Sequence, residues 1–396
     1  MCAYVDDLRW RHRPLFYYGL THVLWGLFWT PRVMVNQHGF ERRIFRGKDR
    51  AGSELRYWYR PPSVPSAGAA GSTGESSADG DREALVFIHG IGVGPVPYMD
   101  FVAQAATEEQ AVIVVELASV SQRISFDTKA ATSETDSQTE SDDLGSQRFT
   151  SWLSSLIVPE MEGLPPLPKR FAELMDDALE DLGIDRVVVA GHSLGSAYAH
   201  YYSMHDREKS LRSSKAKASQ SQEHFAMTPS ESVDAPQINK RRVGGLVLLD
   251  PIACCLYHPS VTSEFVYPQV TGVLQAAEDY FVKKELFAAA LISRHLPWHQ
   301  ANVWLEDCSP AVPTLVGLST DDKIVPSDAV QKVFGSWSAR LRHGTRVLRM
   351  PGLGHGEWLS DHENHLPRLA QEVRKLSSEA AMIGKAQRSV DHFVAQ

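Results

Sequence analysis

The feature that most constrains the fold of this chain is the run Gly191-His192-Ser193-Leu194-Gly195. It follows the apolar residues 187–190 (Val-Val-Val-Ala) and leads into residues 196–204, whose composition suits a helix. A Gly-x-Ser-x-Gly run between a strand and a helix forms a sharp turn, which exposes the serine hydroxyl at the edge of a sheet. The glycines occupy positions where a Cβ atom would clash. This arrangement predicts that Ser193 is a nucleophile.

A second glycine-rich turn, at residues 89–94, can supply the hydrogen-bond donors that attack by a serine nucleophile requires. The apolar residues 84–88 are typical of a buried strand and run into His89-Gly90-Ile91-Gly92-Val93-Gly94. Backbone N–H groups in this turn, and at the start of the helix after Ser193, can face the point where an acyl oxygen gains negative charge. We therefore assign the oxyanion donors to the N–H groups of Ile91 and Leu194. We expect His89 and His192, which lie inside the two turns, to position backbone rather than to transfer protons.

Two later apolar runs end in residues that can complete this site. Residues 314–318 precede Asp322, and residues 346–350 precede His355, which stands between two glycines. A neutral imidazole can take the proton of a serine hydroxyl during attack and return it to the leaving group. An ionised carboxylate fixes the imidazole tautomer and stabilises the imidazolium. We predict that His355 is the base and that Asp322 is the carboxylate.

The acid is less sharply defined by the sequence than the other two residues. Asp321 can serve instead of Asp322, or can cap the turn that follows. Asp250, which follows the apolar residues 246–249, is a further alternative. Whichever acid is used, this chemistry requires neither a metal ion nor an organic cofactor.

The order serine, aspartate, histidine along the chain is that of the α/β-hydrolase superfamily, which this chain resembles over residues 85–376. Residues 322–326 (Asp-Lys-Ile-Val-Pro) and Gly354-His355-Gly356 look like the acid and histidine loops of that family. The aromatic start, the His-Gly-Ile-Gly turn and residues 294–298 (Arg-His-Leu-Pro-Trp) are similar to a poorly characterised eukaryotic branch. The resemblance implies an α/β fold, with a mostly parallel eight-stranded sheet flanked by helices and a helical cap.

These residues and the resemblance predict a serine hydrolase that cleaves a carboxylic ester through an acyl-enzyme intermediate. Residues 251–310 lie where such enzymes carry a cap, and they hold enough aromatic side chains to roof a pocket for an acyl or lipid-like group. The same mechanism would serve a thioesterase, an amidase or a peptidase. A noncatalytic binding module on this fold also stays open. We expect a small-molecule or lipid ester as the partner, and the sequence does not indicate an oligomeric state.

Length and cysteine usage fit one medium-sized domain. The chain has 396 residues, 43% of them hydrophobic, which is enough to bury a large core. We assign residues 33–376 to the hydrolase domain and residues 377–396 to a C-terminal tail. The cysteines show no metal-ligand spacing, which argues against a zinc site or a disulfide framework and favours a reducing compartment. They are Cys2, Cys254, Cys255 and Cys308.

The front of the chain is basic and aromatic. Residues 1–60 hold eleven Lys and Arg against five Asp and Glu, a net charge of +6, whereas the whole chain carries −8. The few arginines and the acidic remainder argue against nucleic acid as a partner. Residues 15–29 are dense in aromatic and aliphatic side chains, but fifteen helical residues reach only about 22 Å, short of a hydrocarbon core of roughly 30 Å.

Two interpretations of residues 1–32 therefore remain open. The segment can lie in a membrane interface through residues 9–32, or it can form a helix buried against the hydrolase body. Acidic Asp6 and Asp7 and the lack of a small-residue cleavage site disfavour a secretory signal. We expect an intracellular protein, either cytoplasmic or peripheral on a membrane that faces the cytosol.

Hydrophobic periodicity predicts the remaining elements. Apolar residues recur at helical spacing over residues 171–182, so we expect an amphipathic helix that stops at Gly183. Three polar segments, 63–81, 127–147 and 208–242, are expected to be solvated insertions without a core of their own. The predicted strands are residues 33–45, 54–59, 84–88, 112–116, 186–190, 246–249, 314–318 and 346–350.

Overall fold

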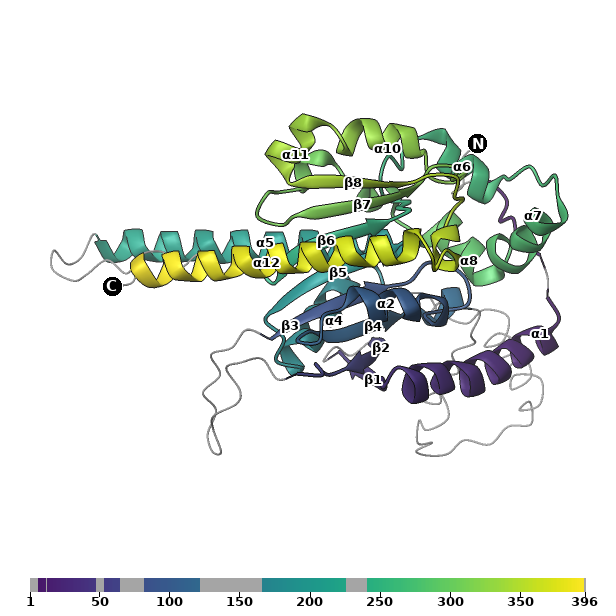
Figure 1. Ribbon diagram of the computed structural model, residues 1–396, viewed down its shortest axis with the longest axis horizontal. Coiled ribbons are helices and arrows are strands. Elements are labelled where there is room, and N and C mark those ends of the chain that lie inside the picture. Colours follow the sequence, from purple (N-terminus) through teal and green to yellow (C-terminus); the bar gives the residue numbers. More distant parts are fainter. Residues whose placement is uncertain are drawn as a thin grey trace, which may run out of the picture.

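Eight strands form a single sheet in the structure, a computed structural model that describes residues 6–11, 13–47, 53–64, 82–121, 166–225 and 241–394 (Figure 1). The order across the sheet is β1-β2-β4-β3-β5-β6-β7-β8. Strand β2 runs antiparallel to both of its neighbours, and the other neighbouring pairs are parallel. The α/β fold class predicted from the sequence is therefore confirmed. The strands are β1 (Glu41–Arg46), β2 (Glu54–Arg60), β3 (Glu83–Ile88), β4 (Ala111–Glu116), β5 (Arg186–His192), β6 (Val243–Leu249), β7 (Thr314–Ser319) and β8 (Thr345–Met350).

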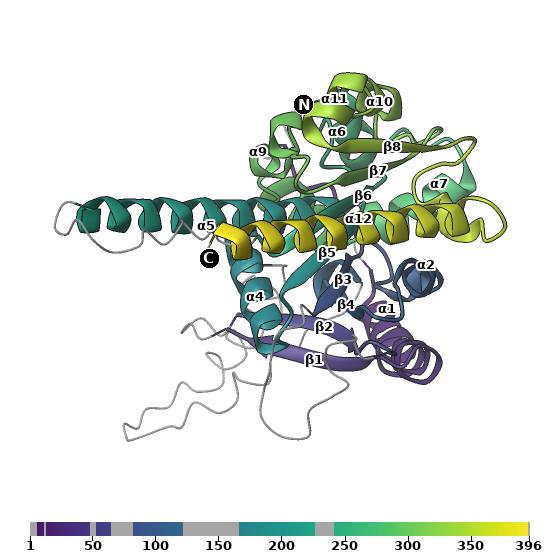
Figure 2. The same cartoon turned by 60° about the vertical axis from the view of Figure 1, so that its left-hand side comes forward.

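Helices cover both faces of this sheet (Figure 2). On one face α4 (Pro168–Asp181) packs beside α5 (Leu194–Phe225), and on the other α2 (Met99–Ala105) packs beside α12 (His365–Val394). Alternate residues of each central strand face opposite layers. In β5, Val189 belongs to the core under α4 and α5, whereas Val188 belongs to the core under α2 and α12. Burial on both sides explains why the parallel strands are continuous apolar runs rather than alternating ones.

Seven of the eight predicted strands are present, and each matches the prediction at one end and is longer by one to three residues at the other. The eighth prediction, residues 33–45, is wrong in its first half. Residues Arg32–Gln37 are helical, and the strand begins only at Glu41. Met34 is buried against the sheet from that helix, and Gly39, at φ +68°, turns the chain so that the N–H of Phe40 donates to the Met34 carbonyl. The valines of this segment favoured a strand on local preference, but tertiary packing selected the helix.

Helix α4 confirms the amphipathic helix predicted from residues 171–182. It begins at Pro168, a residue suited to a first helical turn. The chain leaves the helix through Gly183, at φ +64°, as expected for a glycine beyond a helix C-terminus.

Helix α5 is longer than predicted. It continues to Phe225, so residues 208–225 of the expected solvated insertion are helical. This stretch is rich in Lys, Arg, Ala and Gln, which are good helix formers, and Glu208 pairs with Arg212 one turn later at 3.2 Å. Because the buried first turns of α5 already nucleate the helix, each further residue extends it at little cost. Residues 65–81, 127–147 and 226–240 of the predicted insertions lie outside the described residues.

The C-terminal tail predicted for residues 377–396 is also largely helical. Helix α12 continues without interruption across the boundary set at residue 376 and ends at Val394. Leu376 is fully buried, and Ala380, one turn later, is 2% exposed. Both pack into the core between the sheet and α12. The folded core therefore extends past residue 376, at least to Ala380.

Residues 251–310 form short helices beyond the carboxyl ends of the parallel strands (Figure 1). They are α6 (Pro259–Val266), α7 (Val273–Glu278), α8 (Leu286–Ala290) and α9 (Trp298–Ala301), with further helical turns at Asp279–Lys283, Leu291–His295 and Leu305–Asp307. We call this region the cap segment. Helix α8 packs against the turn Ala118–Ser121, which itself contacts His89. The cap segment therefore borders the turn that follows β3.

The N-terminal segment contains a helical run over residues 15–37, made of α1 (Leu15–Leu20), Thr21–Trp29 and Arg32–Gln37. One side of it contacts the cap segment, because the buried Tyr18 hydroxyl donates to Glu285 at 2.9 Å. Another side faces solvent, where Phe16 and Phe28 are 75% and 68% exposed. The helix therefore packs against the cap segment on one side, as the second interpretation expects, and exposes apolar side chains on the other. Among the described residues, no helix combines the length and apolarity needed to span a membrane.

The burial of α12 generates a stability prediction. Leu376→Ala should lower the free energy of unfolding by about 2–5 kcal/mol, because it removes buried methyl groups and leaves a cavity beside the sheet. The matched control is Met382→Ala on the same helix, whose side chain is 62% exposed and should change stability little. Urea unfolding of both variants tests this expectation. Equal, small losses would show that the end of α12 contributes little to the core.

Candidate active site

Ser193 stands in a strained turn between β5 and α5. Its φ is +52°, a left-handed conformation that side chains other than glycine seldom adopt. Backbone approaches closely on both sides of it. A Cβ atom on Gly191 would lie 2.2 Å from the Gly195 carbonyl oxygen, and one on Gly195 would lie 2.0 Å from the Ile88 carbonyl oxygen. The two glycines are therefore required by packing, and the turn lifts the hydroxyl of Ser193 off the end of β5.

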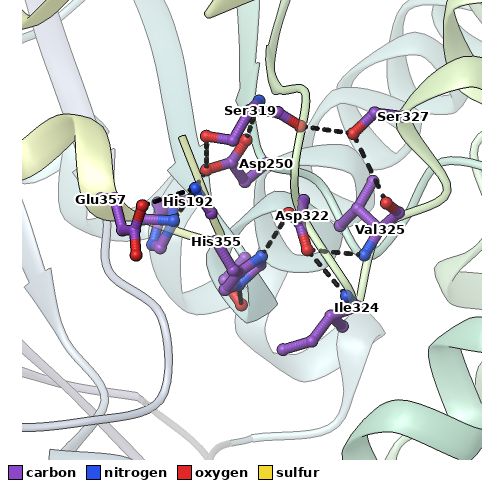
Figure 3. A network of polar contacts seen from close by, with 12 residues as sticks. His192, Asp250, Ser319, Asp322, Ile324, Val325, Ser327, His355 and Glu357 are labelled. Carbon is purple, nitrogen blue, oxygen red and sulfur yellow. Dashed lines mark hydrogen bonds and ion pairs between the residues drawn. The ribbon is translucent and has the colours of Figure 1, made fainter. Parts of the chain in front are cut away.

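His355 lies between Ser193 and Asp322. Its Nε2 is 2.8 Å from the Oγ of Ser193, and its Nδ1 is 2.6 Å from Oδ2 of Asp322. The loop that carries His355 follows β8, and the loop that carries Asp322 follows β7. The structure thus brings together the three residues that the sequence nominated from three separate segments. Figure 3 shows the pair formed by His355 and Asp322.

The environment of His355 favours its protonated form. Burial alone would lower its pKa, but the charge of Asp322, the hydrogen bond to Asp322 and the charge of Asp250 outweigh burial and raise the pKa above 6.5. Glu278 on α7 contributes in the same direction. An imidazolium that forms when the serine proton is transferred would be stabilised here by nearby negative charge.

Asp322 is held by backbone donors. Its side chain is fully buried, and its Oδ1 accepts hydrogen bonds from the N–H groups of Ile324 at 2.8 Å and Val325 at 2.9 Å (Figure 3). These bonds leave Oδ2 directed at His355. Asp321, one of the alternative acids, is exposed, and its carboxylate accepts from the hydroxyl of Thr320. The structure does not bring Asp321 to His355.

Asp250, the other alternative acid, lies close to this group but makes different contacts. It is fully buried, and its carboxylate accepts from Ser319 and from the N–H of Gly356. Burial raises its pKa above the usual value, although the backbone donors oppose this effect. Asp250 therefore bonds the residue after His355 and does not bond the imidazole.

The two nominated oxyanion donors lie in the turns that flank the hydroxyl. Leu194 opens α5, whose first N–H groups have no acceptor within the helix, and Ile91 lies in the turn after β3. His89 fixes that turn. Its Nε2 accepts from the N–H of Leu117 at 3.0 Å, so its Nδ1 carries the proton and donates to the Gly90 carbonyl at 2.7 Å. This agrees with the positioning role expected for His89.

His192 is buried beside the same turn. The Tyr98 hydroxyl accepts from the N–H of Gly90 at 3.3 Å and so is free to donate to Nδ1 of His192 at 2.9 Å. Burial lowers the pKa of His192 well below 6.5, and the imidazole is therefore neutral. His192 links the serine turn to Tyr98 and takes no place in the bonds between Ser193, His355 and Asp322.

Asp250, Asp322 and His355 offer three potential metal-ligand atoms that lie within 4.8 Å of one another. Their lone pairs and protons are already engaged, however. Asp322 and His355 bond each other, and Asp250 accepts from two backbone N–H groups and one hydroxyl. This donor set suits the holding and transfer of a proton better than the coordination of a metal ion.

Sequence reasoning missed two contributors. Tyr98 carries no signal in the chain, because only the fold brings its hydroxyl to His192. Glu357 accepts from the N–H of Gly354 at 2.7 Å and so braces the histidine loop (Figure 3). An acid two residues after His355 in a glycine-rich loop was the available signal for this contact.

Comparison with known proteins places this geometry in a family. The family model described as "Alpha/beta hydrolase family" matches residues 85–372. None of the curated proteins compared matches the sequence. The chain is similar to a thermophilic esterase from Thermogutta terrifontis, with 13% identity, a TM-score of 0.45, and coverage of 86% of this chain and 99% of that one.

Two further solved structures show a similar level of likeness. A membrane phospholipase A described as a bacterial virulence factor has 16% identity, a TM-score of 0.47, and coverage of 93% of this chain and 99% of that one. An esterase from Pyrobaculum calidifontis has 17% identity, a TM-score of 0.43, and coverage of 96% of both chains. At these identities the likeness tells nothing about the substrate. The family match, which spans most of the chain, does decide its membership: this protein belongs to the alpha/beta hydrolase family and is a hydrolase.

Proposed function

We propose that this hydrolase cleaves carboxylic esters through Ser193 and an acyl-enzyme intermediate. The observation that carries the proposal is the continuous hydrogen-bond chain from the Ser193 hydroxyl through His355 to Asp322. Nε2 of His355 takes the hydroxyl proton as Oγ attacks the ester carbonyl, and the N–H groups of Ile91 and Leu194 bind the resulting oxyanion. The imidazolium then gives its proton to the leaving alcohol. A water molecule, activated by the same imidazole, releases the acid.

A fluorophosphonate probe tests the nucleophile. It should label the full-length protein at Ser193, and Ser193→Ala should abolish the labelling. Asp322→Asn should lower ester turnover by about a thousandfold or more, because it removes the carboxylate that orients His355. Asp321→Asn is the matched control, since its exposed carboxylate lies next in sequence but does not contact His355. An unlabelled protein, or equal effects of the two substitutions, would contradict this assignment.

We further propose that the ester carries an acyl or otherwise lipid-like group. The cap segment supports this, because it borders the site at two places: α8 packs against the turn beside His89, and Glu278 of α7 is close enough for its charge to act on His355. Several of its aromatic residues are partly buried against the core, including Phe265, Tyr267 and Trp298. Trp304 has another position, 52% exposed and stacked on Tyr257. A thioester or an amide would use the same machinery, so matched thioesters and amides belong in the substrate panel.

The acyl-chain assignment predicts how activity changes with ester length. If the cap segment encloses the acyl group, kcat/KM should rise with chain length until the pocket is full, by up to about 0.8 kcal/mol of transition-state binding per methylene. Phe287→Ala on α8 should reduce activity more on a long ester than on a short one. Phe281→Ala is the control, since that ring is 44% exposed and contacts Tyr17 on the N-terminal helix. A flat length profile in the unmodified protein would exclude a lipid-like substrate.

We also propose that the exposed face of the N-terminal helix docks on an anionic bilayer, which makes the protein peripheral on a membrane facing the cytosol. Leu24, Phe28, Trp29 and Val35 line one open groove of about 710 Å³, together with the cation of Arg32. Aromatic side chains at a helix surface with nearby arginines are typical of segments that lie in the headgroup region. The net charge of +6 over residues 1–60 complements acidic lipids.

Vesicle flotation tests this docking surface. The protein should float with vesicles that contain phosphatidylserine, float less with neutral phosphatidylcholine vesicles, and lose binding when salt is raised. Phe28→Asp should reduce flotation without loss of probe labelling at Ser193. Leu341→Asp on α11 (Trp337–His343) is the matched control, because Leu341 is 59% exposed on another element. Equal flotation of the two variants would contradict docking through this face.

A further inference from the structure

We propose that Asp250 is a positioning residue, which fixes the histidine loop to the end of β7 and places a second negative charge beside His355. This inference rests on the proposed serine hydrolase function. It gives a role to a buried carboxylate that the bonds between Ser193, His355 and Asp322 do not use. Asp250 acts through its neighbours and makes no hydrogen bond to the imidazole.

The contacts of Asp250 join three neighbouring segments. Its own N–H donates to the Gly317 carbonyl at 2.9 Å, which fixes the end of β6 to β7. Its Oδ1 accepts from the N–H of Ser319 at 2.7 Å, and its Oδ2 accepts from the Ser319 hydroxyl at 2.8 Å. Oδ2 also accepts from the N–H of Gly356 at 2.9 Å (Figure 3). Since Gly356 directly follows His355, this bond anchors the loop at the point where the imidazole leaves it.

Packing alone gives no reason to keep an acid at this position. Asp250 is fully buried, and its φ of +37° is unfavourable for a residue with a side chain. A buried carboxylate loses its hydration, so well-packed apolar side chains are often at least as stabilising at such positions. The distinctive property of Asp250 is that it accepts three donors, one of them from the histidine loop. These three hydrogen bonds serve to hold His355 in place rather than to stabilise the folded protein.

The charge of Asp250 has a second effect on His355. Among the described residues, the charges of Asp322 after β7, Asp250 after β6 and Glu278 on α7 act on this imidazole, and the ring of His192 at the end of β5 packs beside it. His192 is neutral, and its Nε2 lies 4.0 Å from Oδ2 of Asp250. The three carboxylates all favour a protonated His355. Of these three acids, Asp250 bonds the backbone of the histidine loop, and its carboxylate lies within 4.8 Å of an imidazole nitrogen without a hydrogen bond to it.

Asp250→Asn in the full-length protein tests both effects. The amide keeps the size of the side chain but replaces one acceptor by a donor, which must then face the N–H of Ser319 or that of Gly356. Misplacement of the imidazole should lower kcat by about a hundredfold, less than the loss expected for Asp322→Asn. Probe labelling of the unmodified protein at Ser193 tests the serine hydrolase function separately. If the unmodified protein is not labelled, the proposed function fails, whatever the effect of Asp250→Asn.

The pH profile separates the charge effect from a merely structural one. The base must be neutral, so kcat/KM rises with pH through the pKa of His355, and in the unmodified protein this midpoint should lie above 6.5 because that pKa is raised. Removing the negative charge of Asp250 should move the midpoint to lower pH. Asp206→Asn is the matched control. Asp206 is also a buried acid, 5% exposed, but it lies about 18 Å along α5 from the serine turn, and its loss should leave the midpoint unchanged.

The outcomes decide between the alternatives. An unchanged kcat and midpoint in Asp250→Asn would overturn the inference, and a lower kcat with an unchanged midpoint would overturn the charge effect. If Asp250→Asn does not fold, Ser319→Ala takes its place, because it removes one donor to the carboxylate and keeps the charge. That variant should lower kcat and leave the midpoint in place. If the kcat of Ser319→Ala equals that of the unmodified protein, the positioning role is overturned.

Discussion

The close approach of β3 to the turn after β5 is the constraint on which the rest of the site depends. These strands are parallel neighbours, paired from Glu83 opposite Arg186 to Ile88 opposite Gly191. Their carboxyl ends therefore deliver two turns to the same place. A Cβ atom on Gly90 would lie 2.9 Å from the Cβ of Ser193, so the turn that carries Ile91 and the turn that carries the hydroxyl are in direct contact. A larger residue at Gly90 or Gly195 would therefore push the two turns apart.

The same topology explains why so many charged groups meet at one point. Asp250 follows β6, Asp322 follows β7 and His355 follows β8, and these three strands are consecutive in the sheet. Side chains that follow neighbouring parallel strands converge on one edge, although 105 residues separate the first from the last. Burial strengthens every electrostatic interaction there and removes the option of hydration. The carboxylates are tolerated because backbone N–H groups bind the lone pairs that do not serve His355.

Features of the fold and the site that depend on neighbouring residues in the sequence could be predicted, whereas features that depend on contacts between distant segments could not. The fold class and seven strands follow from apolar runs, since a strand buried on both faces is continuous in sequence. Ser193 and His355 were identifiable because glycines flank both of them in the sequence. At Gly191 and Gly195 the tight backbone turn leaves no room for a side chain. The helical state of residues 32–37 was not, because the burial of Met34 against the sheet selects it. The same limit applies to Tyr98 and to the contact of Asp250 with Gly356, which exist only once distant segments are assembled.

The N-terminal helix supports the cap segment with one side and leaves apolar side chains exposed on another. Tyr18 donates to Glu285, and the other carboxylate oxygen of Glu285 accepts from the N–H of Ala288 in the first turn of α8. Helix α8 in turn packs against the turn whose Ser121 contacts His89. The inner face of the N-terminal helix is therefore part of the support of the cap segment. Removal of the whole helix would disturb this support together with any docking surface, whereas substitutions at exposed positions such as Phe28 change the outer face alone.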